Sequence, residues 1–218
     1  GRPLVTVKAA VTLDGKIAAP EDSSAGVVPA WITSEQARTH VQGLRHQADA
    51  ILTGIGTVLA DDCRLTDRTG QERSRPLLRI VLDSQLRLPV ESALVKSCDR
   101  DVMVVTTSAA SEDRRRRLES AGVRVEIAEG RDGRTSLHGV VEILAKERYL
   151  SLMIEAGSKV NWSELESGIA DKIFFYYAPK ILGGLYSLPV AGGTGRRKRK
   201  DAIQFRDLEI HRISRDEF

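Results

Sequence analysis

Residues 44–68 read LRHQADAILTGIGTVLADDCRLTDR, and this stretch combines an apolar strand, a glycine turn and the start of a helix. Residues 50–52 predict a buried strand. Gly54 and Gly56 predict a turn directly after it, and residues 58–60 predict a short helical piece. Glycines let the backbone approach a ligand, and the free N–H groups of a helix start favour an anion. Such a junction is typical of an α/β sheet, which binds ligands at the carboxyl ends of its strands.

Two arginines, Arg45 and Arg68, bracket this turn. Arginine binds phosphate through a planar, always-charged fork of N–H groups. A small molecule that carries phosphate is therefore the expected ligand. Either arginine taken alone is equally compatible with an ordinary surface cation.

Outward from this stretch, apolar runs rich in β-branched residues alternate with amphipathic helical stretches. The alternation predicts an α/β fold with a mostly parallel central sheet and helices on both faces. The predicted strands are 4–11, 50–53, 78–83, 102–106, 123–127, 150–155, 172–177 and 203–213, and the predicted helices are 34–47, 112–121, 137–147 and 160–167. No helix separates the last two strands, so we expect the sheet to end in antiparallel C-terminal strands.

Composition narrows the class of protein. The chain has 218 residues and a formal net charge of +3, which is enough length for one large core and only a weak pointer to acidic ligands. No apolar run approaches the roughly 20 residues needed to span a bilayer, and no signal peptide opens the chain. We therefore expect a cytoplasmic protein with no membrane partner. We also expect residues 1–218 to form a single domain that is a piece of a longer polypeptide.

Cysteine and histidine give no sign of a metal site. Cys63 and Cys98 are too few for a disulfide framework or a zinc site, and the four histidines lack any metal-binding or catalytic spacing. The basic run at 196–200 could bind nucleic acid. No aromatic residue is interleaved with it to stack bases, so a solvated loop is the favoured reading and no nucleic-acid partner is expected.

A second strand–glycine–helix junction follows the strand at 150–155, at Gly157 and Ser158. Two such junctions in one domain fit a ligand with two anionic parts, such as a dinucleotide, although the GxGxxG fingerprint of a Rossmann dehydrogenase is missing. Glu155 ends the apolar strand, where an ionised carboxylate is costly unless it has partners. We therefore predict that Glu155 accepts hydrogen bonds from a substrate.

A third junction ends the strand at 102–106 with hydroxyl side chains, ahead of four arginines at 114–117. It suits a ribose phosphate, but a solvated helix face is the favoured reading of the arginines. Lys8 is expected on the same face of the first strand as Ala10. An inward lysine there calls for a phosphate or sugar oxygen, and the alternative is a lysine that reaches solvent from the strand edge.

Seven segments in order along the chain resemble one known family: VKAAVTLDGKIA, AWITSEQAR, LRHQADAILTGIGTVLADD, RLTDR, RIVLDS, MIEAGSKVNWSEL and YYAPKILGG. They are similar to the reductase domain of the bifunctional riboflavin-biosynthesis deaminase/reductase, and the similarity covers essentially the whole chain. The resemblance implies a dihydrofolate reductase-like fold, usually in a homodimer. It also implies an NADPH-dependent oxidoreductase that reduces the ribosyl group of 5-amino-6-ribosylaminouracil 5′-phosphate, a phosphorylated pyrimidine-ribose, to ribityl.

The resemblance assigns roles to residues by position. It gives cofactor contacts to Ala10, Trp31, Thr57, Asp61, Ser84, Gly157, Ser158, Lys159, Val160, Asn161, Trp162 and Ser163. It gives substrate contacts to Arg45, Leu65, Arg68 and Glu155. Lys8 matches the family's lysine on the first strand and is the candidate for polarising C1′ or helping its protonation, while Glu155 would orient the sugar.

The chain departs from the family pattern at three places. Pro29 stands where a serine is common, the loop at 20–28 is longer, and Cys63 replaces a proline. A missing hydroxyl at Pro29 removes one substrate contact, which leaves open a reductase of the same fold for a pterin or for the diaminopyrimidinone ribosyl phosphate. A non-catalytic nucleotide- or RNA-binding module is the other alternative. The zinc signature of the deaminase half is not found in this chain, and we expect that half upstream of Gly1.

Overall fold

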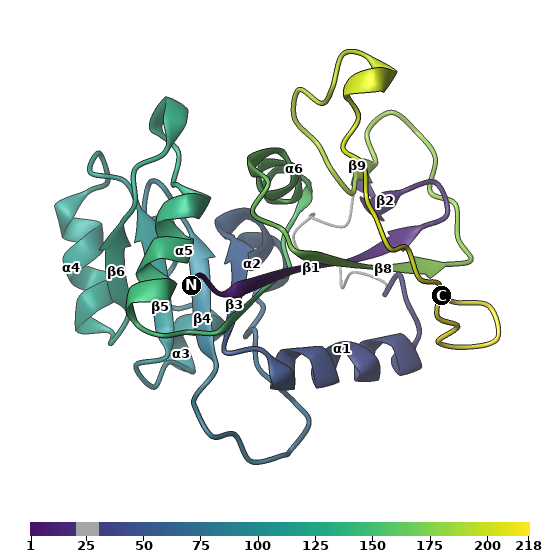
Figure 1. Cartoon of the computed structure of the whole chain (residues 1–218). Coiled ribbons are helices and arrows are strands. Elements are labelled where there is room, and N and C mark those ends of the chain that lie inside the picture. The colour runs from purple at the N-terminus through teal and green to yellow at the C-terminus, as the bar shows by residue number, and fades with distance from the viewer. Residues whose placement is uncertain (21–30) are drawn as a thin grey trace.

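The computed structural model describes residues 1–20 and 31–218, which are built around a seven-stranded sheet (Figure 1). The strand order is β6-β5-β4-β3-β7-β1-β8, and every neighbouring pair runs parallel. The strands are β1 (Leu4–Thr12), β3 (Ala50–Gly54), β4 (Leu78–Leu82), β5 (Val102–Thr106), β6 (Arg124–Ile127), β7 (Ser151–Ile154) and β8 (Lys172–Ala178). The helices are α1 (Glu35–Gln47), α2 (Ile55–Asp61), α3 (Ala93–Lys96), α4 (Glu112–Ser120), α5 (Leu137–Lys146) and α6 (Ser158–Ser167).

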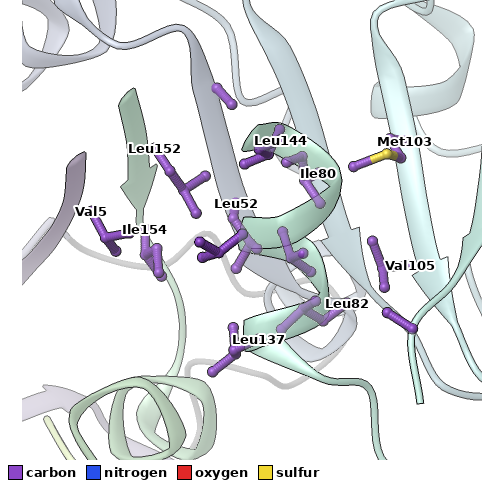
Figure 2. Packing of buried hydrophobic residues seen from close by; sticks show 14 of the residues in the cluster. Val5, Leu52, Ile80, Leu82, Met103, Val105, Leu137, Leu144, Leu152 and Ile154 are labelled. Carbon is purple, nitrogen blue, oxygen red and sulfur yellow. The ribbon is translucent and has the colours of Figure 1, made fainter. Parts of the chain in front are cut away.

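Helices cover both faces of this sheet, which confirms the prediction from the alternating pattern. Figure 2 shows Leu137 and Leu144 of α5 against Leu52, Ile80 and Leu152 of the sheet. The opposite face packs on α1, α2, α3 and α4 through two further apolar clusters. The central strands β3, β4 and β5 are buried along their whole length because they are covered on both sides.

The register of β1 decides which of its side chains reach the site. Every second residue from Val5 to Val11 is buried, so Lys8 and Ala10 lie on the other face. That face is shared with Met153 of β7 and Tyr176 of β8, which pack on α1. The strand order also places the carboxyl ends of β4, β3, β7 and β1 next to one another along one edge of the sheet.

The central sheet does not end in the antiparallel strands predicted at 172–177 and 203–213. β8 pairs parallel with β1, and residues 203–213 form no strand. Antiparallel pairing is found instead in the small sheet of β2 (Lys16–Ala18) and β9 (Leu188–Pro189), and in reciprocal backbone hydrogen bonds between Tyr177 and Phe218. Three apolar residues of this segment, Phe205, Leu208 and Ile210, remain exposed. A period of two produces a strand only where a neighbouring strand and a buried face are at hand.

Helix α6 buries polar residues on one side. Ser158, Asn161 and Glu164 are spaced three apart, and all three are buried. Asn161 Nδ2 donates to the Val190 carbonyl at 2.8 Å, whereas neither carboxyl oxygen of Glu164 has a hydrogen-bond partner within the described chain. Burial alone raises the pKa of Glu164 to about 9, so this carboxyl is protonated at neutral pH.

The protonated state of Glu164 predicts a stability that depends on pH. The pKa is about 9 in the folded state and near 4.5 in the unfolded state, so the unfolded chain releases the proton first as pH rises. The free energy of unfolding should therefore fall between about pH 5 and pH 9, by up to ~1.4 kcal/mol per pH unit. Glu164→Leu should remove this slope and raise stability at pH 8 by at least about 2 kcal/mol.

Urea unfolding at pH 5, 7 and 9 measures the effect. Glu166→Leu, two residues away on the exposed side of α6, is the matched control and should keep the slope. Equal pH slopes in the wild type and in Glu164→Leu would contradict the prediction.

Candidate active site

A carboxylate between two cations lies at the carboxyl end of the central strands. Glu155 directly follows β7, and its backbone N–H donates to the Leu52 carbonyl at 2.9 Å. Arg45, in the last turn of α1, donates through Nε to Glu155 Oε1 at 2.6 Å and through Nη2 to Oε2 at 3.1 Å. Lys8 Nζ donates to Oε2 at 3.4 Å. All three side chains are mostly buried, so the structure joins residues that lie far apart in sequence.

Electrostatics keep this cluster ionised. Burial pushes the pKa of Glu155 upward, but the charges of Lys8 and Arg45 outweigh it and leave the pKa below the usual range. The same carboxylate raises the pKa of Arg45 despite the burial of its guanidinium. One anion and two cations give the cluster a net charge of +1, and an anionic reactant is favoured beside it.

Two neighbours of this cluster were missed by sequence reasoning. The Tyr176 ring lies 5.8 Å from Lys8 Nζ, and its hydroxyl is 2.6 Å from His40 Nδ1 on α1. Burial and the nearby Glu155 charge raise the pKa of Tyr176, so its phenol stays protonated. The period of two along β8 placed Tyr176 on one face of the strand, but only the parallel pairing with β1 sets it opposite Ala10.

The segment after α2 carries the other residues assigned to the substrate. Leu65 is buried in the core, and this burial anchors the loop. Its backbone has a left-handed φ of 54°. Arg45 Nη1 donates to the Thr66 carbonyl at 3.0 Å, and the Arg68 backbone N–H donates to Gln42 Oε1 at 2.9 Å. The side chain of Arg68 is exposed. The loop is therefore bound to α1 on both sides of Asp67.

The two glycine junctions lie against each other, as expected for a shared site. A Cβ on Gly54 would approach Val160 Cγ2 to 2.9 Å, and one on Gly157 would lie 3.6 Å from Thr57 Oγ1. No side chain caps the first turn of α6, and the buried Ser158 hydroxyl has no hydrogen-bond partner in the described structure. Uncapped helix N–H groups with a spare hydroxyl fit an anionic part of a dinucleotide.

The remaining residues assigned to the cofactor come from several different elements. Ser84 follows β4, where its carbonyl accepts from the Thr107 hydroxyl at 3.0 Å. Ala10 shares the face of Lys8, and Asp61 is the exposed last residue of α2. Trp31 is exposed, and its carbonyl accepts from Lys180 Nζ at 2.7 Å. Pro29, with the missing serine, lies outside the described residues.

Several other predictions can be compared with the structure. Arg115 and Arg116 pair with acidic neighbours on α4, as a solvated helix face requires. The basic residues 196–200 are exposed, and Arg196 lies 3.5 Å from Glu166. Burial raises the pKa of Cys63 to about 11, which leaves an unreactive thiol. Among the residues described, no cluster of potential ligands is suited to a metal ion, and no helix has the length and apolarity to cross a membrane.

Comparison with known proteins identifies the family of the chain. The family model described as the RibD C-terminal domain matches residues 3–217. The riboflavin biosynthesis protein RibD of Actinobacillus pleuropneumoniae is 36% identical over 215 residues, which are 99% of this chain and 55% of that protein. The 2,5-diamino-6-ribosylamino-4(3H)-pyrimidinone 5′-phosphate reductase of Methanothermobacter thermautotrophicus is 36% identical over 212 residues, 97% of this chain and 92% of that protein.

A solved structure of Acinetobacter baumannii RibD superposes with a TM-score of 0.82 at 27% identity, covering 99% of this chain and 56% of that one. The chain spans about half the length of the curated RibD proteins that it matches.

The charge cluster predicts a large stability effect at Glu155. Glu155→Gln leaves Lys8 and Arg45 beside each other without their anion, so it should lower the free energy of unfolding at pH 7 by about 3 kcal/mol. Because the pKa of Glu155 is lowered in the folded state, its contribution is present above about pH 4.5 and is lost as pH falls. The difference between variant and wild type should therefore shrink at pH 3. Urea unfolding at both pH values measures it.

Glu119→Gln is the control for this measurement, because it removes the partner of Arg115 on the exposed face of α4. It should change stability little at either pH. An equally small effect of Glu155→Gln at pH 7 would show that the cluster does not stabilise the fold.

Proposed function

The chain belongs to the RibD C-terminal domain family, and we propose that it is a cytoplasmic NADPH-dependent reductase of riboflavin biosynthesis. Its substrate is 5-amino-6-ribosylaminouracil 5′-phosphate, whose ribosyl group it reduces to ribityl. The observation that carries the proposal is the cluster of Lys8, Arg45 and Glu155, which lies beside the two glycine junctions at one edge of the sheet.

The printed names of the relatives support the class of substrate. The Methanothermobacter thermautotrophicus protein is named for a diaminopyrimidinone ribosyl phosphate, and a Thermotoga maritima structure, 32% identical, is titled in part as a 5-amino-6-(5-phosphoribosylamino)uracil reductase. Both molecules carry a pyrimidine, a ribose joined through nitrogen, and a 5′-phosphate. The diaminopyrimidinone is therefore the second candidate substrate for this chain.

A reductase of this fold uses a nicotinamide cofactor, and when bound that cofactor supplies the hydride for C1′. Gly157 and Ser158 at the start of α6, with Thr57 of α2, would hold its pyrophosphate. Arginines around Ser84 support the choice of NADPH, because a 2′-phosphate calls for positive charge. Arg114 Nη1 donates to the Gln85 carbonyl at 3.1 Å, and the half-exposed Arg87 lies on the same turn.

Glu155 and Lys8 act on the reacting sugar. The Glu155 carboxylate has lone pairs beyond those used by Arg45 and Lys8, and it accepts hydrogen bonds from ribose hydroxyls, which orients C1′. Lys8 is held at 3.4 Å from that carboxylate, with its ammonium near the same substrate atoms. Its positive charge polarises the C1′ centre, and its three N–H groups can help to protonate the ring oxygen when the sugar opens.

We further propose that the protein is a homodimer. Residues 181–188 expose several apolar side chains on one segment, with Leu185 at 88% and Tyr186 at 79% exposure. Leu208 and Ile210 are also exposed on the C-terminal segment that forms no strand. Large exposed apolar side chains gathered in one part of a chain mark an interaction surface, and a second copy of the chain fits the family.

An activity assay tests the proposed function. Purified protein with NADPH should oxidise the cofactor in the presence of 5-amino-6-ribosylaminouracil 5′-phosphate, followed at 340 nm, with a ribityl product identified by mass spectrometry. The diaminopyrimidinone ribosyl phosphate and a dihydropterin are the parallel substrates, and NADH replaces NADPH in a further arm. Turnover of the diaminopyrimidinone ribosyl phosphate alone would show that this second candidate, and not the ribosylaminouracil phosphate, is the substrate. No turnover of either ribosyl phosphate would refute the proposal.

A substitution of Arg68 tests the assignment of the phosphate. Arg68→Ala should raise KM for the phosphorylated substrate about 10- to 100-fold, because a charge-assisted contact is worth about 1.5–3 kcal/mol. KM for NADPH should remain nearly unchanged. Arg64→Ala, an exposed arginine on the same loop, is the control and should leave both constants near their wild-type values. A rise confined to the NADPH constant would instead place Arg68 at the cofactor.

A further inference from the structure

Arg73 is a largely buried arginine outside every motif of the sequence analysis, and its guanidinium binds the end of helix α1. Nη1 donates to the carbonyls of Arg45 at 3.1 Å and His46 at 2.7 Å, and Nη2 donates to the carbonyl of Ala48. The last carbonyls of a helix have no partner within the helix, and a cation there also interacts favourably with the helix dipole. Arg73 therefore fixes the backbone from which the Arg45 side chain extends.

The same guanidinium also holds the loop that carries Arg68. Arg73 Nη1 donates to Asp67 Oδ2 at 3.2 Å, and His46 Nδ1 lies 2.7 Å from that oxygen. The Thr69 backbone N–H donates to Asp67 Oδ1 at 2.9 Å. Burial opposes the charge of Asp67, but these hydrogen bonds outweigh it and lower its pKa to about 2. Asp67 is therefore an anion that is bound on both of its oxygens.

Asp67 lies between Thr66, whose carbonyl binds Arg45, and Arg68, whose side chain is exposed. The direction of the Arg68 side chain depends on its backbone. The Arg68 guanidinium makes no hydrogen bond within the described part of the chain, so nothing but the loop aims it. A rotation of the backbone at Asp67 would displace the tip of Arg68 by far more than it displaces the loop.

We propose that Arg73, through Asp67, is a positioning residue for the substrate phosphate. It fixes the loop at 66–69 against the end of α1, which holds Arg45 and Arg68 at a constant separation. The inference rests on the proposed function, since it takes Arg68 as the residue that contacts the phosphate. A misplacement of about 1 Å in such a group can cost up to ~100-fold in rate, so this clamp acts on substrate binding and not only on stability.

Arg75 offers a matched control two residues away. Its guanidinium lies 3.4 Å from the Tyr149 ring centroid, and it donates to the carbonyls of Glu147 and Arg148. These contacts fasten the same connecting segment to a different part of the molecule, and none of them involves residues 45–69. Arg75→Ala should therefore lower stability without changing the geometry around Arg68.

The experiment measures steady-state constants and urea unfolding for the wild type, Arg73→Ala, Arg73→Lys, Asp67→Asn and Arg75→Ala. Arg73→Ala should raise KM for the phosphorylated substrate by about 10-fold or more, with KM for NADPH within about 2-fold of wild type. Arg73→Lys keeps the charge but not the fork, and should give an intermediate KM. Asp67→Asn should resemble Arg73→Ala. Arg75→Ala should lower stability and leave both KM values unchanged.

A substrate without its 5′-phosphate separates positioning from general damage. If the clamp acts through Arg68, the ratio of kcat/KM between wild type and Arg73→Ala should fall toward 1 on the dephosphorylated ribosylaminouracil. An equal loss on both substrates, or unchanged KM in Arg73→Ala together with lowered stability, would overturn the proposal. Should Arg73→Ala fail to fold, Arg73→Lys and Asp67→Asn take its place. For each of them, the ratio of kcat/KM between wild type and variant is compared on the phosphorylated and the dephosphorylated substrate.

Failure of the proposed function has a different signature, because the wild type itself would then turn over neither ribosyl phosphate. Binding of ribose 5-phosphate by calorimetry tests the clamp in that case. Affinity that is lost in Arg68→Ala and also lowered in Arg73→Ala supports the clamp. Affinity that depends on Arg68 but is unchanged in Arg73→Ala overturns it, and so does the absence of any ribose 5-phosphate binding.

Discussion

The structure of the site depends on one charge, the Glu155 carboxylate at the end of a buried strand. A carboxylate in that position is costly unless cations and hydrogen bonds surround it. Arg45 and Lys8 supply them, and each comes from a different element, α1 and β1. The need to neutralise Glu155 therefore fixes how the end of α1, the middle of β1 and the end of β7 lie relative to one another. In the proposed function, those three places are where a sugar phosphate and a dinucleotide would meet.

The second set of contacts extends this constraint to the loop after α2. Arg45 also donates to the Thr66 carbonyl, so the side chain that neutralises Glu155 holds the loop as well. Arg73 and Asp67 bind the loop to α1 from its other side. Arg45 and Arg73 each contact both a carboxylate and at least one backbone carbonyl, so the loop is restrained from two sides. Rigid support of this kind is what allows an exposed side chain to meet a small ligand repeatedly in one pose.

Sequence reasoning reached the core elements and the charged residues but not the contacts between them. The period of two and the glycine junctions predict β3, β7 and the placement of Glu155, because these features are local. The strand predicted at 203–213 was wrong because a strand also needs a neighbour, which local pattern does not report. Tyr176 and Arg73 were missed for the same reason. Their partners lie 136 residues away at His40 and about 27 residues away at the end of α1, and only the strand order and the helix end bring them together.

Arg45 and Arg68 differ in how many of their N–H donors are still free to bind a ligand. Arg45 makes three bonds through all three of its nitrogens, to Glu155 and to Thr66, and is left with two of its five N–H donors. Arg68 makes no side-chain bond in the described chain and keeps all five donors. Bidentate recognition of a phosphate is therefore more available to Arg68, while Arg45 contributes mainly charge and the position of Glu155. The bracket of two arginines seen in the sequence is asymmetric in the folded protein, because the Arg45 side chain already binds Glu155 and Thr66 whereas the Arg68 side chain keeps its donors for the proposed phosphate.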